Sequence, residues 1–151
     1  MGLKLAVLAY LKRDGMTLML HKVRGHQQGK WNGLGGKLEP GESSEQALRR
    51  EVLEESGLSV GSARLCGFIT FPDFDDADDW YTFVYTVSEF SGELAASDEG
   101  ELRWVPDGEV PSLNLWEGDR VFLPWLEQPH FFSAVFRYEQ GEFEGREVAF
   151  Y

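Results

Sequence analysis

GKLEPGESSEQALRREVLEESGL, residues 36–58, carries the most specific pattern in this sequence. Its glycines and charged residues follow one spacing, G-x5-E-x7-R-E-U-x-E-E-x-G-U, where U is an apolar residue. Every position of the pattern is filled. The matching residues are Gly36, Glu42, Arg50, Glu51, Val52, Glu54, Glu55, Gly57 and Leu58.

The middle of this stretch, residues 44–55, is predicted to form a helix. Ser43 is a candidate N-cap, and Gln46 follows three residues later, which is the spacing of a capping box. Gly57 suits the left-handed conformation that commonly follows the last helical turn. Both ends of the helix are therefore marked in the sequence.

Glu51, Glu54 and Glu55 occupy positions i, i+3 and i+4, so we expect their side chains on one face of that helix. Carboxylates this close repel one another. Mg²⁺, or Mn²⁺, is the natural compensation, because a hard cation takes oxygen ligands. Three glutamates alone would indicate only a solvated acidic face, but the full pattern favours a metal site. Arg50 is expected on another side of the helix, where an ion pair with Glu42, or with a helix glutamate, would hold the helix against the preceding loop.

The whole chain has the composition of one globular domain. Its 151 residues are 42% hydrophobic and 26% charged, and no linker or repeat divides them, so we expect a single domain, residues 1–151. No apolar run approaches the roughly 18 residues of a membrane helix. Cys66 is the only cysteine. It fits a reducing cytoplasm and is interpreted as a small buried hydrophobe.

The formal net charge of −12 restricts the partners. It argues against a binder of nucleic-acid polymers, which would need a basic surface. A polyanionic substrate would be repelled as well, unless metal ions bridge the charges. The acidic balance and the carboxylate helix therefore both favour a metal-bridged anionic substrate. We separately expect no membrane association and no obligate protein partner.

Short apolar runs separated by turn signals predict strands on both sides of the helix. A Gly-rich loop, residues 25–36, precedes the helix, and residues 117–128 predict a second helix, which Pro124 can kink. Hairpins dominate, so the expected fold is α+β, an α/β/α sandwich with helices on the faces of a mixed sheet. The expected strands are residues 3–11, 17–23, 34–38, 63–71, 80–89, 101–106, 131–138 and 144–150. An acidic run is expected as a solvated hairpin loop: Asp73, Asp75, Asp76, Asp78 and Asp79.

Residues 36–58 resemble an intact Nudix box, the signature of hydrolases that cleave nucleoside diphosphates linked to another group. The resemblance implies the Nudix fold, with a mixed sheet, a box helix and a C-terminal helix. It also implies dependence on Mg²⁺ or Mn²⁺. The ligands that it implies are the Gly36 carbonyl, Glu51, Glu54 and Glu55.

Two residues outside these ligands extend the implied site. Glu99 matches a further acid that assists the metal or acts as base, although Glu101 competes with it and a solvated loop is the alternative. Lys37 follows the box glycine and is either a phosphate contact or a surface lysine. The proton of the attacking water would pass to Glu51, Glu55 or Glu99.

The segment GKWNGLGGKLEPGES, residues 29–43, resembles the MutT-like branch that removes oxidised purine nucleotides. In that branch an asparagine reads the purine edge, and Asn32 matches it. The chemistry agrees, because an amide both donates and accepts hydrogen bonds. The alternative is that residues 31–33 form only a turn.

Three more residues match base-binding positions of that branch. Trp116 matches a tryptophan that stacks on the base, and Asp119 matches an acid that recognises its edge, although Gly118 stands where a second acid can occur. Phe71 matches a phenylalanine that packs on the base. The alternatives are a core or rim aromatic for Trp116, an N-cap for Asp119 and a core residue for Phe71.

The whole-chain pattern resembles the MutT-like 8-oxo-dGTP diphosphatase group. This implies Mg²⁺-dependent hydrolysis of an oxidised purine nucleoside triphosphate, by attack at the β-phosphorus, to the monophosphate and pyrophosphate. The alternative enzyme is a Nudix diphosphatase for ADP-ribose, a dinucleoside polyphosphate or an undamaged dNTP. A catalytically inactive Nudix module would be expected to lose box acids, and an acidic scaffold would not need the pattern at all.

Overall fold

The computed structural model describes residues 2–24, 28–75 and 77–151. The start of the expected Gly-rich loop, residues 25–27, and Asp76 of the acidic run lie outside the described residues. The strands are β1 (Leu3–Arg13), β2 (Met16–Lys22), β3 (Trp31–Asn32), β4 (Leu34–Lys37), β5 (Ser59–Asp75), β6 (Asp78–Ser91), β7 (Gly100–Pro106), β8 (Phe132–Glu139) and β9 (Glu142–Phe150). The helices are α1 (Ser44–Ser56) and α2 (Glu117–Phe122), with 3₁₀ segments η1 (Asp107–Ser112) and η2 (Leu123–Glu127).

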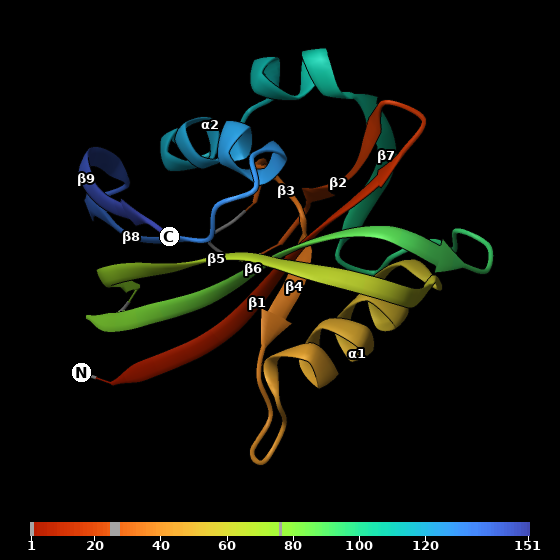
Figure 1. The fold of residues 1–151 in the computed structure, drawn as a ribbon, viewed down its shortest axis with the longest axis horizontal. Coiled ribbons are helices and arrows are strands. Elements are labelled where there is room, and N and C mark those ends of the chain that lie inside the picture. The colour runs from red at the N-terminus through yellow and green to blue at the C-terminus, as the bar shows by residue number, and fades with distance from the viewer. Residues whose placement is uncertain (1, 25–27, 76) are drawn as a thin grey trace.

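A mixed sheet forms the centre of the molecule (Figure 1). Its order is β3-β2-β1-β6-β5-β8-β9, with β4 also paired to β1 and β7 to β2. The pairs β1–β6 and β5–β8 are parallel. Strand β1 meets β2 only near their shared turn, where Lys12 faces Thr17 and Arg13 faces Met16, while its earlier part pairs with β4. Strand β2 therefore leaves the side of β1 and forms a smaller sheet with β3 and β7.

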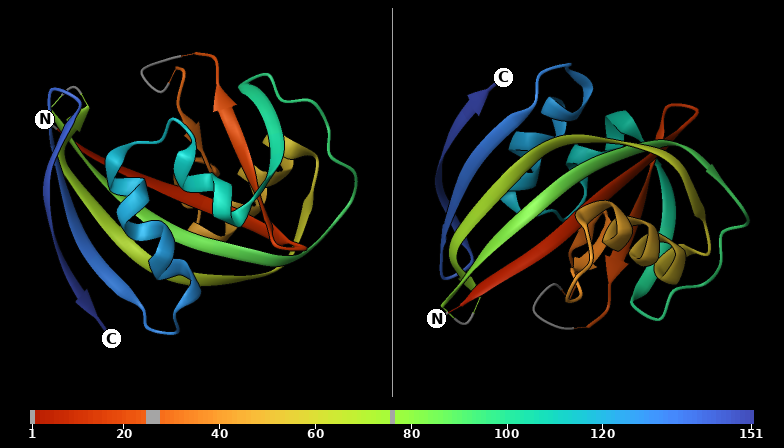
Figure 2. Two further views of the ribbon diagram at one scale, coloured as in Figure 1. Left: turned by 90° about the horizontal axis from the view of Figure 1, so that it is seen from above. Right: turned by 60° about the horizontal axis from the view of Figure 1, so that its bottom comes forward.

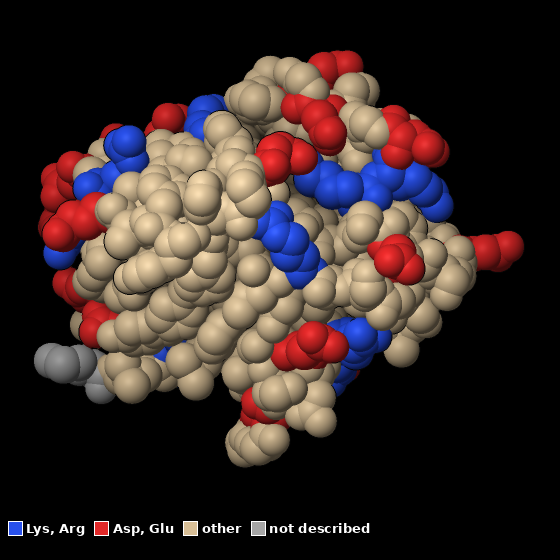
Figure 3. Space-filling view, in the orientation of Figure 1, with Lys and Arg blue, Asp and Glu red and all other residues tan. Residues whose placement is uncertain are grey.

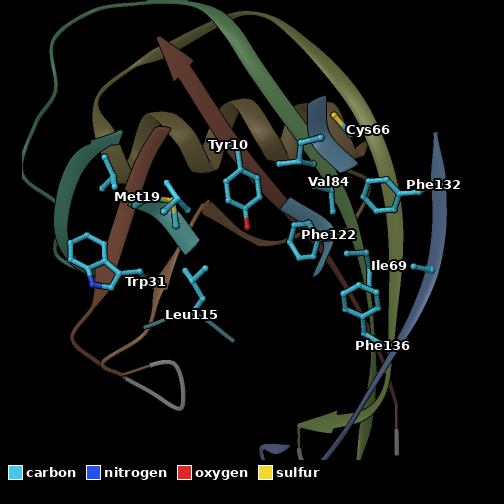
Figure 4. Close-up of a cluster of buried hydrophobic side chains, with 14 of the residues drawn as sticks. Tyr10, Met19, Trp31, Cys66, Ile69, Val84, Leu115, Phe122, Phe132 and Phe136 are labelled. Atoms are coloured by element: carbon cyan, nitrogen blue, oxygen red, sulfur yellow. The ribbon is translucent and has the colours of Figure 1, made fainter. Parts of the chain in front are cut away.

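Helices cover both faces of the sheet (Figures 1 and 2). On one face Leu48 and Val52 of α1 are fully buried in an apolar cluster with residues of β1, β2 and β4. On the other face Phe122 of α2 is buried in a second cluster, with Tyr10 and Phe132 among its members (Figure 4). This layering confirms the predicted α+β class.

Helix α1 follows its sequence signals closely. The Ser43 side chain accepts a hydrogen bond from the Gln46 backbone, and the Gln46 side chain accepts one from the Ser43 backbone, so the capping box is complete. Gly57 ends the helix in the left-handed conformation, with φ 78°. Cys66 is fully buried, as predicted for a small hydrophobe.

The predicted single helix over residues 117–128 is wrong. Helix α2 ends at Phe122, and the chain continues as η2. Pro124 lies at the start of η2, where its missing N–H and its ring prevent continuation of the α-helical ladder. The proline therefore interrupts the helix rather than merely kinking it.

Two strands run further than predicted. The pairing of β5 with β6 extends to Asp75 and Asp78, so part of the acidic run belongs to strands rather than to a loop. The Asp73 backbone N–H donates to the Asp79 carboxylate at 2.7 Å, which ties the hairpin together. The two-residue strand β3 and the segment η1 were not predicted at all.

Part of the sheet extends beyond α1 and carries few charges. Figure 3 shows a mostly uncharged surface in the left half of the view, where β1, β6 and β5 lie in Figure 1. Leu3 and Leu5 of β1 are exposed. Among the described residues, no helix is long and apolar enough to cross a membrane.

Candidate active site

A cavity of about 380 Å³ lies beside the first part of β1, where β2 has left its side. Its wall includes residues of β1, β3, β4 and β6, and the turn that leads into α2. Two predicted site residues, Glu54 and Glu55, do not line the cavity. Glu55 is next to it, because it accepts a hydrogen bond from the lining residue Gly35. The predicted residues that do line it are Asn32, Gly36, Lys37, Glu51, Phe71, Glu99, Trp116 and Asp119.

The helix glutamates differ in their surroundings. The Glu55 side chain is only 6% exposed; one carboxylate oxygen accepts a hydrogen bond from the Gly35 N–H at 2.8 Å, and the other lies 3.8 Å from the Lys22 ammonium. Glu51 is half-buried against Gly36, where an added Cβ would lie 2.6 Å from its carboxylate. A side chain at position 36 would therefore displace the Glu51 carboxylate from where it lies. Glu54 has a side chain 58% exposed.

Arg50 holds these acids to the loop before the helix. Its guanidinium makes two hydrogen bonds to Glu42, at 2.7 and 2.9 Å, which confirms the predicted ion pair. It also donates to Glu51 at 2.8 Å and to Glu54 at 3.4 Å. Arg50 was expected on another side of the helix from the glutamates, but its long side chain reaches both the preceding loop and two of the helix glutamates. Hydrogen bonds from Arg50 lower the pKa of Glu42 to about 2.

Burial makes the inner carboxylates costly to ionise. It raises the pKa of Glu55 to about 7, against the opposing effect of Lys22. Burial also raises the pKa of Glu51, against the hydrogen bond from Arg50. A divalent cation would relieve both penalties.

The donors around Gly36 fit Mg²⁺ or Mn²⁺, because all of them are oxygens: the Gly36 carbonyl and the box carboxylates. Within residues 2–24, 28–75 and 77–151, however, no three acidic, histidine or cysteine side chains meet in an arrangement that would by itself hold a metal ion. Magnesium commonly keeps waters and takes substrate phosphates as further ligands. The site therefore fits a cation that binds together with a phosphorylated substrate.

Glu99 faces the same cavity from the loop before β7. Its competitor Glu101 instead pairs with Arg103 at 2.8 Å and does not line the cavity. The geometry thus favours Glu99 as the extra acid. Lys37 is exposed and lies with its ammonium 5.6 Å from the centre of the Trp80 ring, at the cavity wall.

The opposite end of the cavity holds buried polar groups. Asn32 is 9% exposed, and its side-chain Nδ2 has no hydrogen-bond partner among the described residues. Asp119 is 7% exposed; burial raises its pKa to about 7, against the opposing effects of Lys30 and Arg120. The N-cap alternative for Asp119 is wrong, since Trp116 is the N-cap of α2. The turn alternative for Asn32 is wrong too, because Asn32 pairs with Leu20 in the sheet.

Aromatic rings form the walls around these polar groups. The ring of Phe74 lies 5.3 Å from that of Phe71 and 5.6 Å from that of Trp116. Trp116 in turn lies 5.6 Å from Tyr138. Trp116 and Phe71 are only partly buried, so they are rim and wall residues rather than core residues.

Several lining residues have side chains that can contact a ligand and were not predicted from the sequence, among them Lys22, Phe74, Trp80, Thr82 and Tyr138. Lys22 is the one with a local signal, since it lies at the end of the predicted strand 17–23, just before the Gly-rich loop. The Trp80 indole N–H is buried and lacks a partner among the residues that the structure describes. Tyr138 reaches the cavity only because β8 pairs with β5, which no local pattern indicates.

A family model described as the NUDIX domain matches residues 2–126 of the chain. The chain is 35% identical to a protein of Danio rerio named oxidized purine nucleoside triphosphate hydrolase, over 90% of this chain and 87% of that protein. It is 31% identical to the protein of that name from Mus musculus, with the same coverage.

Solved structures show the same fold. A MutT protein from Bacillus halodurans superimposes with a TM-score of 0.86 at 28% identity, covering 96% of this chain and 97% of that one. A MutT NUDIX hydrolase from Burkholderia pseudomallei gives a TM-score of 0.72 at 30% identity, covering 83% of this chain and 97% of that one.

Proposed function

The chain belongs to the NUDIX hydrolase family as a MutT-like diphosphatase, and from this premise we propose that it hydrolyses oxidised purine nucleoside triphosphates. The proposed substrate is 8-oxo-dGTP, and the products are the nucleoside monophosphate and pyrophosphate. The role would be to remove oxidised nucleotides from the pool. We further propose that residues 1–151 form one domain and that the protein acts in the cytoplasm.

One observation carries this proposal: a single cavity is lined both by acids and a lysine and by the buried Asn32 amide, whose Nδ2 has no hydrogen-bond partner among the described residues. Leaving the Asn32 amide unpaired in a buried place costs about 1–3 kcal/mol, which a ligand with a matching acceptor would recover. A purine edge carries such acceptors. The relatives from Danio rerio and Mus musculus, named for oxidised purine substrates, support the same choice.

The aromatic walls suit a flat base. Stacking of a base on an aromatic side chain is worth about 1–3 kcal/mol in single-strand binders. Trp116 and Phe71 line the cavity beside Asp119, so a base between them would present its edge to the buried acid. We therefore assign base binding to Asn32, Phe71, Trp116 and Asp119.

The phosphate end would hold the divalent cation, Mg²⁺ or Mn²⁺. When bound, such a cation neutralises charge on the phosphates and lowers the pKa of a coordinated water. Lys37, at the rim, would contact a phosphate oxygen. The residues assigned as metal ligands are the Gly36 carbonyl, Glu51, Glu54, Glu55 and Glu99.

The chain itself must also accept a proton from the water that attacks the β-phosphorus. Glu51, Glu55 and Glu99 are the candidates for this base, because each is a carboxylate at or directly behind the phosphate end. Burial raises the pKa of Glu55 to about 7 without a cation, and a bound cation would lower it, so Glu55 would be ionised and able to accept the proton once the cation is in place. The ion pair of Arg50 with Glu42 fixes α1, which carries two of these three acids.

The test is a kinetic panel with Mg²⁺ and full product analysis. We expect kcat/KM to be higher for 8-oxo-dGTP than for dGTP, which carries the same triphosphate, and the products to be monophosphate and pyrophosphate. ADP-ribose, a dinucleoside polyphosphate and undamaged dNTPs complete the panel. A preference for any of these three, or no hydrolysis of 8-oxo-dGTP, would contradict the proposal.

A further inference from the structure

Tyr138 of β8 places its hydroxyl at the start of α2. The Gly118 backbone N–H donates a hydrogen bond to the Tyr138 hydroxyl oxygen at 2.7 Å. A Cβ added at Gly118 would lie 2.6 Å from that oxygen and 2.6 Å from the Phe136 ring. The hydroxyl therefore occupies the space where a side chain at position 118 would begin, directly before Asp119.

This hydroxyl has a proton left to donate. Its oxygen already accepts the Gly118 N–H, and no acceptor for its own proton is present among the described residues. Burial raises the pKa of Tyr138 well above its usual range, so the group stays protonated at any pH at which the enzyme would work. A protonated tyrosine hydroxyl whose oxygen already accepts one hydrogen bond has its own proton free to donate.

The Tyr138 hydroxyl belongs to the part of the cavity assigned to the purine base. Tyr138 lines the cavity together with Asn32 and Asp119. Its ring lies 5.4 Å from the Phe74 ring and 5.6 Å from the Trp116 ring, so it belongs to the same aromatic wall of the cavity. A merely structural role, as the cap of the Gly118 N–H, explains the acceptor side of the hydroxyl and leaves the donor side without a purpose.

The neighbouring polar groups form a pattern that one class of purine matches. A 6-oxopurine has an acceptor at C6 next to a donor at N1. A 6-aminopurine has the reverse, a donor at C6 next to an acceptor at N1. The Tyr138 hydroxyl, with its proton to donate, lines the cavity with the Asp119 carboxylate, which accepts when ionised, and this pair complements the 6-oxo arrangement.

We propose that Tyr138 is a specificity-determining residue whose hydroxyl donates a hydrogen bond to the oxygen at C6 of a bound purine. The pocket then favours guanine-type bases over adenine-type bases. This inference rests on the proposed function, because it requires a purine nucleotide in the cavity. Sites built to hydrogen-bond a substrate group discriminate well against analogues that lack it, since their own buried groups are then left unpaired.

The test compares the wild type with Tyr138→Phe, which keeps the ring and removes only the hydroxyl. The substrates are 8-oxo-dITP and 8-oxo-dATP, which share the 8-oxo group and differ only in the 6-oxo or 6-amino pattern of the edge. We expect the wild type to prefer 8-oxo-dITP. In Y138F the ratio of kcat/KM for 8-oxo-dITP to that for 8-oxo-dATP should fall roughly 3- to 10-fold, as for loss of one hydrogen bond.

Tyr81→Phe is the matched control, because Tyr81 packs against Phe68 and does not line the cavity. That variant should leave the ratio unchanged. If Y138F lowers kcat/KM for both substrates equally, the hydroxyl only supports α2 and the inference is wrong, although the proposed function stands. The wild-type ratio is decisive even if Y138F does not fold, since a preference for 8-oxo-dATP also overturns the inference. If the wild type hydrolyses neither nucleotide, nor 8-oxo-dGTP, both proposals fail.

Discussion

Asp119 is an aspartate whose folded surroundings oppose its charge. Burial raises its pKa from 3.8 to about 7 in the folded protein. Its contribution to stability is therefore complete below about pH 4, where both states are protonated, and is lost as the pH rises through 7. This direction is opposite to that of Glu42, whose pKa is lowered to about 2 and whose contribution is lost only as the pH falls towards 2.

The change that tests this is Asp119→Asn, which keeps the shape and removes the charge. Between pH 5 and pH 8 the free energy of unfolding of the wild type should fall relative to that of D119N, by a few kcal/mol at most. Urea denaturation at pH 5, 6, 7 and 8 measures the difference. Glu55 titrates in the same range in both proteins, so it cancels. If the free energies of unfolding of the two proteins change with pH in parallel, the pKa of Asp119 is not raised by folding and the prediction is wrong.

Single residues also show what the sequence could indicate about the site. Glu51 and Gly36 are found from spacing alone, because the box pattern names them and the structure places them in contact. Tyr138 has no such signal. Its hydroxyl reaches Gly118 only through the packing of β8 on the sheet, and packing between distant segments is invisible to local pattern.

At the scale of elements, helix α1 depends on the glycine that ends it. Gly57 has φ 78°, and an added Cβ would lie 3.0 Å from the Ala95 side chain and 3.0 Å from the Glu93 carbonyl. We expect Gly57→Ala to destabilise the protein by about 1–2 kcal/mol or more, because it combines left-handed strain with these contacts. Thermal and urea unfolding measure the loss.

Gly108→Ala is the control for this substitution. An added Cβ at Gly108 meets no atom within 4 Å, and its φ is not positive. That variant should stay within about 0.5 kcal/mol of the wild type. Equal losses for G57A and G108A would show that the end of α1 does not require the left-handed glycine.

Local signals predicted the elements unequally well. Helix α1 was predicted to within one residue of its C-terminal end, since the capping box and Gly57 both act within a few residues of the chain. The second helix was predicted too long, because apolar spacing continues past Pro124 although the hydrogen-bond ladder does not. Strand β3 has only two residues and exists through its pairing with β2, so its own residues give no strand pattern.

At the scale of the whole molecule, the charge balance makes the protein sensitive to divalent cations. The chain carries a net charge of −12, and burial raises the pKa of two box glutamates, Glu51 and Glu55. A cation that binds the folded protein stabilises it by about 2.7 kcal/mol at 100 times its Kd. We therefore expect the Tm to rise with added Mg²⁺, and to rise less with NaCl at the same ionic strength.

Glu54→Gln distinguishes Mg²⁺ binding at the box glutamates from a general effect of ionic strength on an acidic protein. Its side chain is 58% exposed, so E54Q should fold with nearly the wild-type Tm in the absence of Mg²⁺. It should lose most of the Mg²⁺-dependent rise in Tm, and its kcat/KM should fall on the order of 100-fold. Glu109→Gln, a change at an exposed glutamate of η1, should behave as the wild type in both measurements. Normal activity of E54Q would refute the assigned metal site.

The parallel pairing of β1 with β6 has a consequence for how the chain folds. Strand β1 pairs with β2 and β4, which are near it in the sequence. Its third partner, β6, is distant: Leu3 pairs with Asp79 and Leu11 with Val87. The entropy of closing so long a loop is lost before the contact between β1 and β6 can stabilise the chain. Non-local pairings of this kind slow folding. During synthesis on the ribosome, the edge of β1 that pairs with β6 therefore stays unpaired until β6 has been made. The centre of the sheet closes only after more than half of the protein has been synthesised.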